Sequence, residues 1–470
     1  IWQETCSAST KLARLEDELT RIEDRLAAPE VYGDEKILTR TLLRQDKLLQ
    51  EYDRLEGPRY EGYVRSTLFS LGFNESDLNL PVETLSGGQK KLVGLAKLLV
   101  TKPDMLLLDE PDNHLDLDGK RFLERFIREY KGGVIIVSHD RYLLDLVADE
   151  IAELEDGKLV LYPGNYSEYA FEKETRLLRQ QQLFQAQHKE ITRLEQSAKR
   201  LLTWGKVYDN EKFIRRGQSI LKRLEKIERI DKPILDRRQM GLELGGRRGG
   251  DKVLEIKGLT KQFAPPGDGG DATTILADVN LLVIRGQRVG LVGPNGAGKS
   301  LLFRIILEQE PPSAGQIEIG PSIKTGYYAQ QHETLDYNRT LIETVRHAAR
   351  FTEEAAVGFL RRFLFDYDQA RGPVENLSGG ERSRLQMALL MLSGANFLML
   401  DEPTNNLDIA SIEVLENVLE EFDGTVLTIS HDRYFLDRVA DRISELDGGS
   451  ITEYPGSYSD YNAAKARSMS

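Results

Sequence analysis

The chain contains an internal repeat in which short motifs recur 292 positions later without a gap. The matched motifs are Leu85-Ser86-Gly87-Gly88-Gln89 with Leu377-Ser378-Gly379-Gly380-Glu381, Asp109-Glu110-Pro111 with Asp401-Glu402-Pro403, Ser138-His139-Asp140 with Ser430-His431-Asp432, and Tyr162-Pro163-Gly164 with Tyr454-Pro455-Gly456. The register holds over 85 residues, with 85–169 matching 377–461. A fixed-period repeat of this kind predicts a duplicated domain.

Length and composition agree with a globular chain of several domains. The 470 residues correspond to about three domains at ~150 residues each. No apolar run approaches the ~18 to 20 residues of a membrane helix, and the first ten residues lack the layout of a secretory signal. Cys6 is the only cysteine, which excludes internal disulfides, iron–sulfur clusters and cysteine-based zinc sites. These features favour a cytoplasmic protein without a membrane domain.

The net charge of −13 hides an uneven distribution. Between Arg176 and Met240 there are 17 Lys and Arg against 8 Asp and Glu, a local balance of +9. The rest of the chain therefore carries about −22, which is −13 minus +9. The pattern indicates two acidic lobes joined by a basic helical connector.

The second lobe contains a phosphate-binding loop. Its residues fit the pattern G-x-x-x-x-G-K-[ST] and are Gly293, Pro294, Asn295, Gly296, Ala297, Gly298, Lys299 and Ser300. A predicted strand at 288–292 precedes the loop and an apolar helix at 301–307 follows it, which is the context that gives this pattern meaning. The glycines allow backbone N–H groups to surround a phosphate, Lys299 adds a positive charge, and Ser300 can bind Mg²⁺. The sequence therefore predicts an ATP site.

Five further residues of the second lobe have predicted roles at that site. Asp401 and Glu402 end an apolar strand, so we expect Asp401 to hold Mg²⁺ and Glu402 to act as general base. Gln330, after the predicted strand 325–329, could touch both the metal ion and the attacking water. His431 ends the strand 425–430 and could bond the γ-phosphate. Phe263 could stack on adenine, although an ordinary core phenylalanine is the open alternative.

A second phosphate-binding edge precedes a helix in both copies of the repeat. Serine and two glycines at a helix start supply an N-cap and unobstructed backbone donors. We call 85–89 and 377–381 the signature segments of the first and second lobe. The predicted nucleotide-binding residues in them are Ser86, Gly87, Gly88 and Gln89, and Ser378, Gly379, Gly380 and Glu381. Neither segment can easily reach the phosphate loop of its own lobe.

These motifs resemble those of ATP-binding cassette proteins, here with two cassettes on one polypeptide. The resemblance implies an α/β fold and head-to-tail pairing, in which each ATP lies between the phosphate loop of one lobe and the signature segment of the other. One such composite site is complete, formed by the second lobe's loop and the first lobe's signature segment. The other has Glu110 and His139 opposite Ser378, but residues 1–84 contain no phosphate loop. We therefore expect the first cassette, and the N-terminus that starts with Ile1, to be incomplete.

Residues 11–56 are predicted to form two antiparallel helices. Leu12, Leu15, Leu19, Ile22 and Leu26 follow a helical spacing, 29–33 makes a turn, and 37–55 returns. The second lobe has no counterpart, because Gln330 to Leu377 spans only 47 residues. The hairpin is either a plain structural projection or, as such projections more often are, an arm that contacts a partner.

The connector is predicted to be two basic helices with an aromatic and basic tip. Leucines and isoleucines from 177 to 202 suit the first helix, and those from 220 to 230 suit the second. The predicted RNA-contacting residues at the tip are Trp204, Lys206, Tyr208, Lys212, Arg215, Arg216, Lys222 and Arg223. Such a tip could contact phosphates with an affinity that falls with salt; a solvated, charged coiled coil is the alternative.

Two cassettes, an arm, a basic linker and no membrane domain together resemble the ABC-F group. The resemblance implies a cytoplasmic ATPase that uses ATP and Mg²⁺ and binds the ribosome, with contacts to ribosomal RNA and peptidyl-tRNA. ATP binding would close the lobes within a monomer and hydrolysis would release them. The expected domains are a first cassette at 1–170, a linker at 171–250 and a second, complete cassette at 251–470. Translation control and antibiotic protection of ribosomes both remain open.

Two other functions fit parts of the same pattern. The cassettes could belong to the ATPase subunit of a membrane transporter, although the fused pair with a basic linker argues against it. A DNA-maintenance ATPase is the other alternative, because a basic coiled linker would also suit branched DNA. The single cysteine excludes the zinc-bearing excision-repair class and the iron–sulfur ribosome-recycling class.

Overall fold

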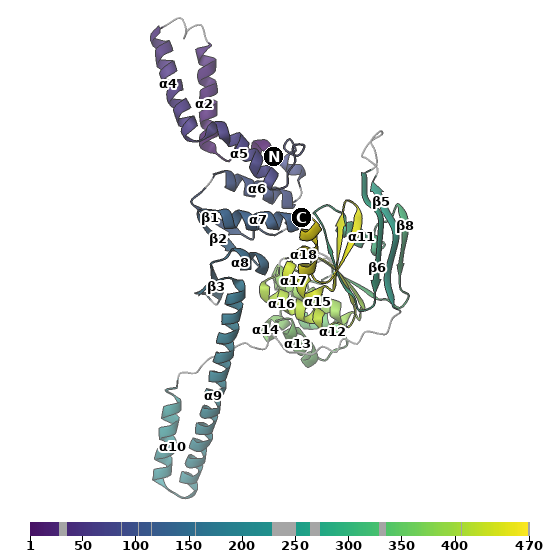
Figure 1. The fold of residues 1–470 in the computed structure, drawn as a ribbon. Coiled ribbons are helices and arrows are strands. Elements are labelled where there is room, and N and C mark those ends of the chain that lie inside the picture. The colour runs from purple at the N-terminus through teal and green to yellow at the C-terminus, as the bar shows by residue number, and fades with distance from the viewer. Residues whose placement is uncertain are drawn as a thin grey trace.

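The computed structural model describes ten segments of the chain (Figure 1). They are 1–27, 35–85, 87–101, 103–113, 115–155, 157–227, 251–263, 273–328, 335–405 and 407–468. Gln330, Ser86 and the glycine-rich join at 241–250 lie outside these segments. Two lobes pack side by side, and two helical hairpins project from the first lobe at opposite ends (Figure 1).

The second lobe is built on a six-stranded sheet in the order β13-β12-β7-β11-β10-β9. These strands are β7 (Arg288–Val292), β9 (Thr325–Tyr328), β10 (Phe397–Asp401), β11 (Thr425–Ile429), β12 (Arg442–Asp447) and β13 (Ser450–Pro455). All pairings are parallel except the one between β12 and β13. Every residue of β10 and β11 is buried, as expected for central parallel strands covered on both faces. Their carboxyl ends meet at one edge, where ligands bind in such sheets.

Two layers cover that sheet. On one face lie an antiparallel sheet and helix α11 (Lys299–Ile306), which share a core with Phe397 and Met399 of β10. The antiparallel sheet contains β5 (Lys252–Phe263), β6 (Thr273–Ile284) and β8 (Ala314–Ile319). Leu398 and Leu400 point to the opposite face and join the second core. This alternation along β10 is what places one strand between two hydrophobic layers.

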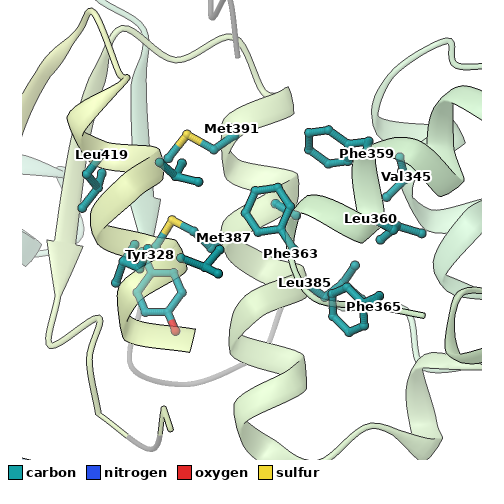
Figure 2. Close-up of a cluster of buried hydrophobic side chains, with 14 of the residues drawn as sticks. Tyr328, Val345, Phe359, Leu360, Phe363, Phe365, Leu385, Met387, Met391 and Leu419 are labelled. Atoms are coloured by element: carbon teal, nitrogen blue, oxygen red, sulfur yellow. The ribbon is translucent and has the colours of Figure 1, made fainter. Parts of the chain in front are cut away.

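Helices form the second layer. They are α12 (Leu341–Ala348), α13 (Glu353–Arg362), α14 (Tyr367–Arg371), α15 (Gly379–Leu392), α16 (Ile409–Glu420), α17 (Arg433–Val439) and α18 (Tyr458–Ser468), with the 3-10 turn η2 (Val374–Asn376) before α15. Figure 2 shows Leu385, Met387 and Met391 of α15 packed among the aromatic rings of this core. Phe363 lies next to Phe359, and the centroids of these two rings are 5.2 Å apart. This packing fixes the helix that begins at the second signature segment.

The first lobe repeats part of this plan. Its elements are α1 (Trp2–Cys6), α5 (Gly57–Ser70), η1 (Val82–Thr84), α6 (Gly87–Thr101), β1 (Met105–Asp109), α7 (Leu117–Glu129), β2 (Gly133–Val137), α8 (Arg141–Val147), β3 (Glu150–Glu155) and β4 (Lys158–Pro163). Adding 292 to the bounds of β1, β2, β3 and β4 gives β10, β11, β12 and β13. The parallel pairing of β1 with β2 also keeps the register of β10 with β11. The repeat in the sequence is therefore a repeat in structure.

The sheet of the first lobe is split into two pairs of strands. β1 pairs with β2, and β3 pairs with β4, whereas in the second lobe β7 joins β11 to β12. Among the described residues of the first lobe no strand takes the place of β7. One face of the β1–β2 pair is exposed: Leu107 is 70% and Ile135 56% exposed, while Met399, at the position of Leu107 in the repeat, is fully buried.

The projection near the N-terminus is a hairpin of α2 (Thr10–Leu26) and α4 (Glu35–Arg54) (Figure 1). Leu12, Leu15, Leu19 and Ile22 are buried along α2, in agreement with the apolar spacing. Two polar contacts also join the helices: Tyr52 donates to Glu16 at 3.0 Å, and Arg44 lies 3.2 Å from Glu18. We call this hairpin the arm.

The second projection is formed by α9 (Tyr166–Val207) and α10 (Glu211–Leu224) (Figure 1). Helix α9 starts at Asn165, whose side chain caps it together with Glu168, so the linker continues directly from the first lobe. The second helix starts at Glu211, earlier than the apolar pattern from 220 to 230 predicted. Lys212, Arg215 and Arg216 therefore lie on α10. Gly205 and Gly217 permit the close packing, because a Cβ on Gly217 would come 2.8 Å from Leu202 Cγ.

The two lobes meet through paired ion contacts that follow the repeat. Arg141 at the start of α8 is bonded to Glu416 of α16, and Arg433 at the start of α17 is bonded to Glu124 of α7. The two arginines are 292 positions apart (433 − 141), and so are the two glutamates (416 − 124), which is the offset of the repeat. All four residues are buried. Between the two pairs, Tyr142 and Tyr434 form an edge contact with ring centroids 6.1 Å apart.

We expect Glu124→Gln to weaken the contact between the lobes by about 3 to 5 kcal/mol, because it leaves the buried Arg433 guanidinium without its counter-charge. Hydrogen–deuterium exchange of α7 and α17 should rise by roughly 10²-fold or more, the equivalent of that free energy. Glu18→Gln, which removes the carboxylate of an exposed pair in the arm, should change exchange little. A double variant, Glu124→Met with Arg433→Met, should recover protection; equal exchange in Glu124→Gln and the parent protein would contradict the assignment.

Candidate functional site

A cavity of about 690 Å³ lies between the lobes and is lined by both of them. The second lobe contributes the phosphate loop, the end of β10 and His431, and the first lobe contributes the start of α6 and the segment before α7. The residues that matter for the site are Asn295, Gly296, Gly298, Lys299, Ser300, Asp401, Glu402 and His431 from the second lobe, and Gly87, Gly88, Asn113 and Lys120 from the first. The predicted loop and signature segment therefore face one space.

The phosphate loop connects β7 to α11 through three glycines with positive φ. Gly293, Gly296 and Gly298 have φ values of 148°, 84° and 99°, a region that side chains disfavour. A Cβ on Gly293 would also lie 2.1 Å from the backbone oxygen of Leu446. The Lys299 ammonium donates to the carbonyls of Gly293 (2.7 Å) and of Pro294 next to it. Burial lowers the pKa of Lys299, so an anion in the loop would offset the cost of burying its charge.

Ser300 and Asp401 lie together at the end of the sheet and fit a magnesium ion. The Ser300 hydroxyl is 3.3 Å from an Asp401 oxygen, and burial raises the pKa of that carboxyl. Hydroxyl and carboxylate oxygens are ligands that Mg²⁺ prefers, usually with phosphate and water completing the shell. In the described part of the chain no cluster of three or more His, Cys, Asp or Glu could hold a metal ion by itself. The donor set therefore suits a magnesium ion that arrives with a nucleotide.

Glu402 is held by the backbone next to His431. Its φ of 49° is unusual for a residue with a side chain, and its N–H donates to the Ile429 carbonyl at 2.9 Å. The His431 N–H donates to one carboxylate oxygen at 3.3 Å, and His431 Nε2 lies 3.4 Å from the other. Burial raises the pKa of Glu402 to about 7, with Lys299 opposing that rise. Such a carboxyl can exchange a proton near neutral pH, as a general base must.

The His431 imidazole is neutral in this setting. Burial lowers its pKa well below the usual value, and the Lys299 and Lys120 ammonium groups lower it further. Its Nδ1 atom is buried and has no hydrogen-bond partner among the described residues. A neutral imidazole with one nitrogen beside Glu402 keeps the other for a second partner. The Glu402 carboxylate thus lies beside one nitrogen of the imidazole, while the other nitrogen is buried.

The first lobe's signature segment faces the phosphate loop of the second lobe. Gly87 and Gly88 begin α6 and line the cavity, and a Cβ on Gly87 would meet nothing within 4 Å. Gln89 lines a neighbouring cavity together with Asn295 and Gly296 of the loop. The Asn295 N–H also donates to Asp116, the N-cap of α7, at 3.1 Å. Backbone donors of a helix start thus lie opposite the loop, as anion binding requires.

Phe263 lies at the rim of the same cavity. It ends β5, is 42% exposed, and has the Lys261 ammonium 4.9 Å from its ring centroid. This exposure argues against the alternative of an ordinary core phenylalanine. Ile275 of β6 lines the cavity beside it. An exposed aromatic ring at the mouth of a phosphate site suits a planar base.

The matching residues of the first lobe form a second, more open arrangement. His139 Nε2 lies 3.6 Å from Glu110, and their side chains are 42% and 39% exposed, against 11% and 13% for His431 and Glu402. Glu110 has the same unusual backbone, with φ 45°. Ser378 caps α15 in a reciprocal bond pair with Glu381, and Gly379 and Gly380 follow it. Among the described residues no phosphate loop faces this segment.

Two polar residues at the site were not predicted. Asp116 contacts the loop across the lobes, and Lys120 donates to the His431 carbonyl at 3.0 Å. Contacts between residues 179 and 311 positions apart leave no local pattern in a sequence. The repeat did contain a signal for Lys120, because the position 292 residues later is Ile412.

The opposite pKa shifts of Asp432 and Asp140 can be tested through the pH dependence of stability. Burial raises the pKa of Asp432 to about 6, so its contribution to stability is largest below pH ~4 and is lost as the pH rises through about 6. Asp432→Asn keeps the cap of α17, which the amide oxygen can accept. We expect it to stabilise the fold by roughly 2 kcal/mol at pH 7.5, with a much smaller effect at pH 4.5.

Asp140→Asn is the control, because the pKa of Asp140 is shifted in the opposite direction from that of Asp432. Both variants are compared by thermal unfolding. The buried Lys120 ammonium holds the pKa of Asp140 below its usual value despite the opposing effect of burial. Its carboxylate therefore stabilises the fold above pH ~4 and loses that effect in more acidic solution. Asp140→Asn should lower the melting temperature at pH 7.5. The same pH trend in both variants would contradict the assigned environments.

Two sequence-family profiles match the chain. Both are described as ABC transporter; one matches residues 16–113 and 276–405, and the other matches 152–243. The first profile thus covers parts of both lobes and the second covers the linker. Within the described residues, no helix has both the length and the apolar composition needed to cross a membrane.

Three relatives match about 90% of the chain. The putative ATP-binding protein YdiF of Bacillus subtilis is 40% identical over 90% of this chain, which spans 64% of that protein. The energy-dependent translational throttle protein EttA of Escherichia coli K12 is 37% identical over 90% of the chain and 76% of its own length. The ATP-binding protein Uup of Haemophilus influenzae is 33% identical over 92% of this chain and 65% of its own length.

A solved structure described as RNase-L Inhibitor has a similar fold. It superposes with a TM-score of 0.58 at 21% identity, covering 86% of this chain and 71% of the other. At this identity the likeness concerns the fold alone. It agrees with two cassettes that pack against each other.

Proposed function

Because the chain belongs to the ABC-F group of ATP-binding cassette proteins, we propose that it hydrolyses ATP between its lobes and acts on the ribosome. The observation that supports this most is the shared cavity, in which Lys299 and Glu402 of the second lobe face Gly87 of the first. A triphosphate in that position would join the lobes. Hydrolysis would remove the bridge and let them separate.

The phosphate loop and the signature segment would bind the nucleotide. Lys299 would turn from the loop carbonyls to the phosphates, and the amides of 293–298 would surround them. The amides at Gly87 and Gly88, with Ser86 and Gln89, would bind the terminal phosphate from the other side. Phe263 would stack on the base. In the second, incomplete site Glu110, His139, Ser378, Gly379, Gly380 and Glu381 would take the equivalent positions.

Residues at the ends of β10 and β11 would carry out the hydrolysis. Ser300 and Asp401 would hold Mg²⁺, with Gln330 as a third ligand, and the ion would neutralise charge on the phosphates. Glu402 would accept a proton from the attacking water as general base. His431, neutral and bonded to Glu402, would hold the terminal phosphate.

We expect Glu402→Gln to lower the rate of ATP hydrolysis by roughly 10²-fold or more while ATP binding persists, because the amide cannot accept the proton. The measurement is phosphate release and nucleotide affinity of the full-length protein. Glu354→Gln, an exposed change on α13, should match the parent protein. An unchanged hydrolysis rate in Glu402→Gln would contradict the assigned base.

The comparisons favour translation over the two alternatives. The relatives include proteins named as translational throttles, at 38% identity in Haemophilus influenzae and 37% in Escherichia coli. On this basis we propose that the protein works in the cytoplasm as a monomer, with ribosomal RNA and peptidyl-tRNA as partners. The two profiles are described as ABC transporter, but none of the relatives reported above is named as a transporter subunit or as a DNA-maintenance ATPase.

The linker hairpin supplies a surface suited to nucleic acid. All eight predicted residues are exposed in the structure; they are Trp204, Lys206, Tyr208, Lys212, Arg215, Arg216, Lys222 and Arg223. Tyr208 is 70% and Trp204 46% exposed beside the turn. Exposed aromatic rings next to cations combine stacking with phosphate contact. The short turn between α9 and α10 lies at the far end of the projection (Figure 1). Trp204, Lys206, Tyr208 and Lys212 lie close to this turn in the chain, whereas Lys222 and Arg223 lie in the last turn of α10, away from it.

We expect Lys212→Glu with Arg215→Glu and Arg216→Glu to weaken ribosome binding at least tenfold, with a smaller salt dependence, because phosphate contacts are lost. Co-sedimentation of the ATP-bound full-length protein with 70S ribosomes measures this. The matched control reverses Arg125, Arg128 and Lys158, which are exposed on the first lobe. ATP hydrolysis without ribosomes should be unchanged in both variants. Equal ribosome binding by both would contradict the linker assignment.

A further inference from the structure

Lys120 and Asp112 break the symmetry of the lobes at one place. The repeat aligns Lys120 with Ile412 and Asp112 with Thr404, whereas the arginines, glutamates and tyrosines of the lobe contact are the same in both copies. Both departures lie in the first lobe and both line the cavity. The first lobe therefore has a carboxylate and an ammonium group at the two positions where the second lobe has a hydroxyl and an alkyl group.

The Lys120 side chain joins the two lobes. Its ammonium donates to an Asp140 oxygen at 2.8 Å within the first lobe and to the His431 carbonyl at 3.0 Å in the second. Only 10% of the side chain is exposed. Asp112 is buried nearby and accepts from Ser138 at 2.7 Å. A long, flexible side chain has therefore been fixed in one conformation at the junction.

The environment keeps Lys120 charged although it is buried. Burial lowers its pKa, but Asp140 and Asp112 more than offset this, so the pKa lies above the usual value. A charged ammonium makes a stronger bond to a carbonyl than a neutral donor does. Asp140 in turn is fixed by its bonds to the Tyr142 and Leu143 amides at the start of α8. The carbonyl of His431 is thus tied to a helix start of the opposite lobe.

That carbonyl belongs to the residue that orients the predicted general base. The His431 N–H and Nε2 both contact the Glu402 carboxylate. The bond from Lys120 can form only when the lobes are together, because its two ends lie on different lobes. We propose that Lys120 is a positioning residue, which aligns the His431–Glu402 pair when the lobes close. This inference rests on the proposed ATPase function.

A purely structural role makes a different prediction. Lys120 could serve only to neutralise Asp140 and Asp112. In that case replacing Lys120 and Asp112 together would restore the protein, because Asp140 would then have the same neighbours as Asp432 in the second lobe. The second lobe shows that the fold accepts a threonine and an isoleucine at these two positions, which are Thr404 and Ile412. Asp432, the counterpart of Asp140, still caps α17 there. The variants Lys120→Ile, Asp112→Thr and their combination therefore separate the two roles.

We expect Lys120→Ile and the double variant to lower kcat about tenfold, while KM for ATP changes less than twofold. Misalignment of a reacting group lowers the rate without removing a binding contact. Asp112→Thr should stay within twofold of the parent protein, and Lys120→Arg, which keeps the cation, should retain more activity than Lys120→Ile. The measurement is steady-state ATP hydrolysis by the full-length protein, with melting temperatures to show that the variants fold.

The outcomes separate this inference from the proposed function. If the double variant has the kcat of the parent protein, or if Lys120→Ile changes KM alone, the positioning role is wrong although the ATPase assignment stands. If the parent protein hydrolyses no ATP, the proposed function itself fails. A folded double variant with low kcat and unchanged KM supports the positioning role.

Discussion

The buried contact between the lobes is the interaction on which the rest of the site depends. Arg141 with Glu416, and Arg433 with Glu124, link helix starts of one lobe to helices of the other. Because each pair is buried, its charges are stabilised only when both lobes are present. The same contact brings α6 and α7 to the phosphate loop, so that Gly87 and Asp116 lie where a nucleotide would join them.

The two lobes are nearly identical at this contact, but their Glu–His pairs differ in exposure. The Glu402 and His431 side chains are 13% and 11% exposed, whereas those of Glu110 and His139 are 39% and 42% exposed. Burial raises the pKa of Glu402 toward neutrality, whereas no comparable enclosure surrounds Glu110. Lys120 adds a further asymmetry, because it approaches the complete site from the opposite lobe.

Local patterns predicted most of the second lobe. The strand at 288–292 and the strand that ends at Asp401 were found because apolar runs and glycines are local signals. Part of the segment that was predicted to be the tip of the linker is helical, including Gly205. In the structure it lies within α9, where a Cβ would come 2.5 Å from Ile214 Cγ1. Cross-lobe contacts such as Lys120 with His431 could not be predicted, since they join distant residues.

The most direct test is a structure of the full-length protein with Mg²⁺ and a non-hydrolysable ATP analogue. The account predicts one triphosphate in contact with the Lys299 ammonium and, on its other side, with the backbone amides of Gly87 and Gly88. A nucleotide bound by the second lobe alone, with the start of α6 turned away from it, would contradict the shared site.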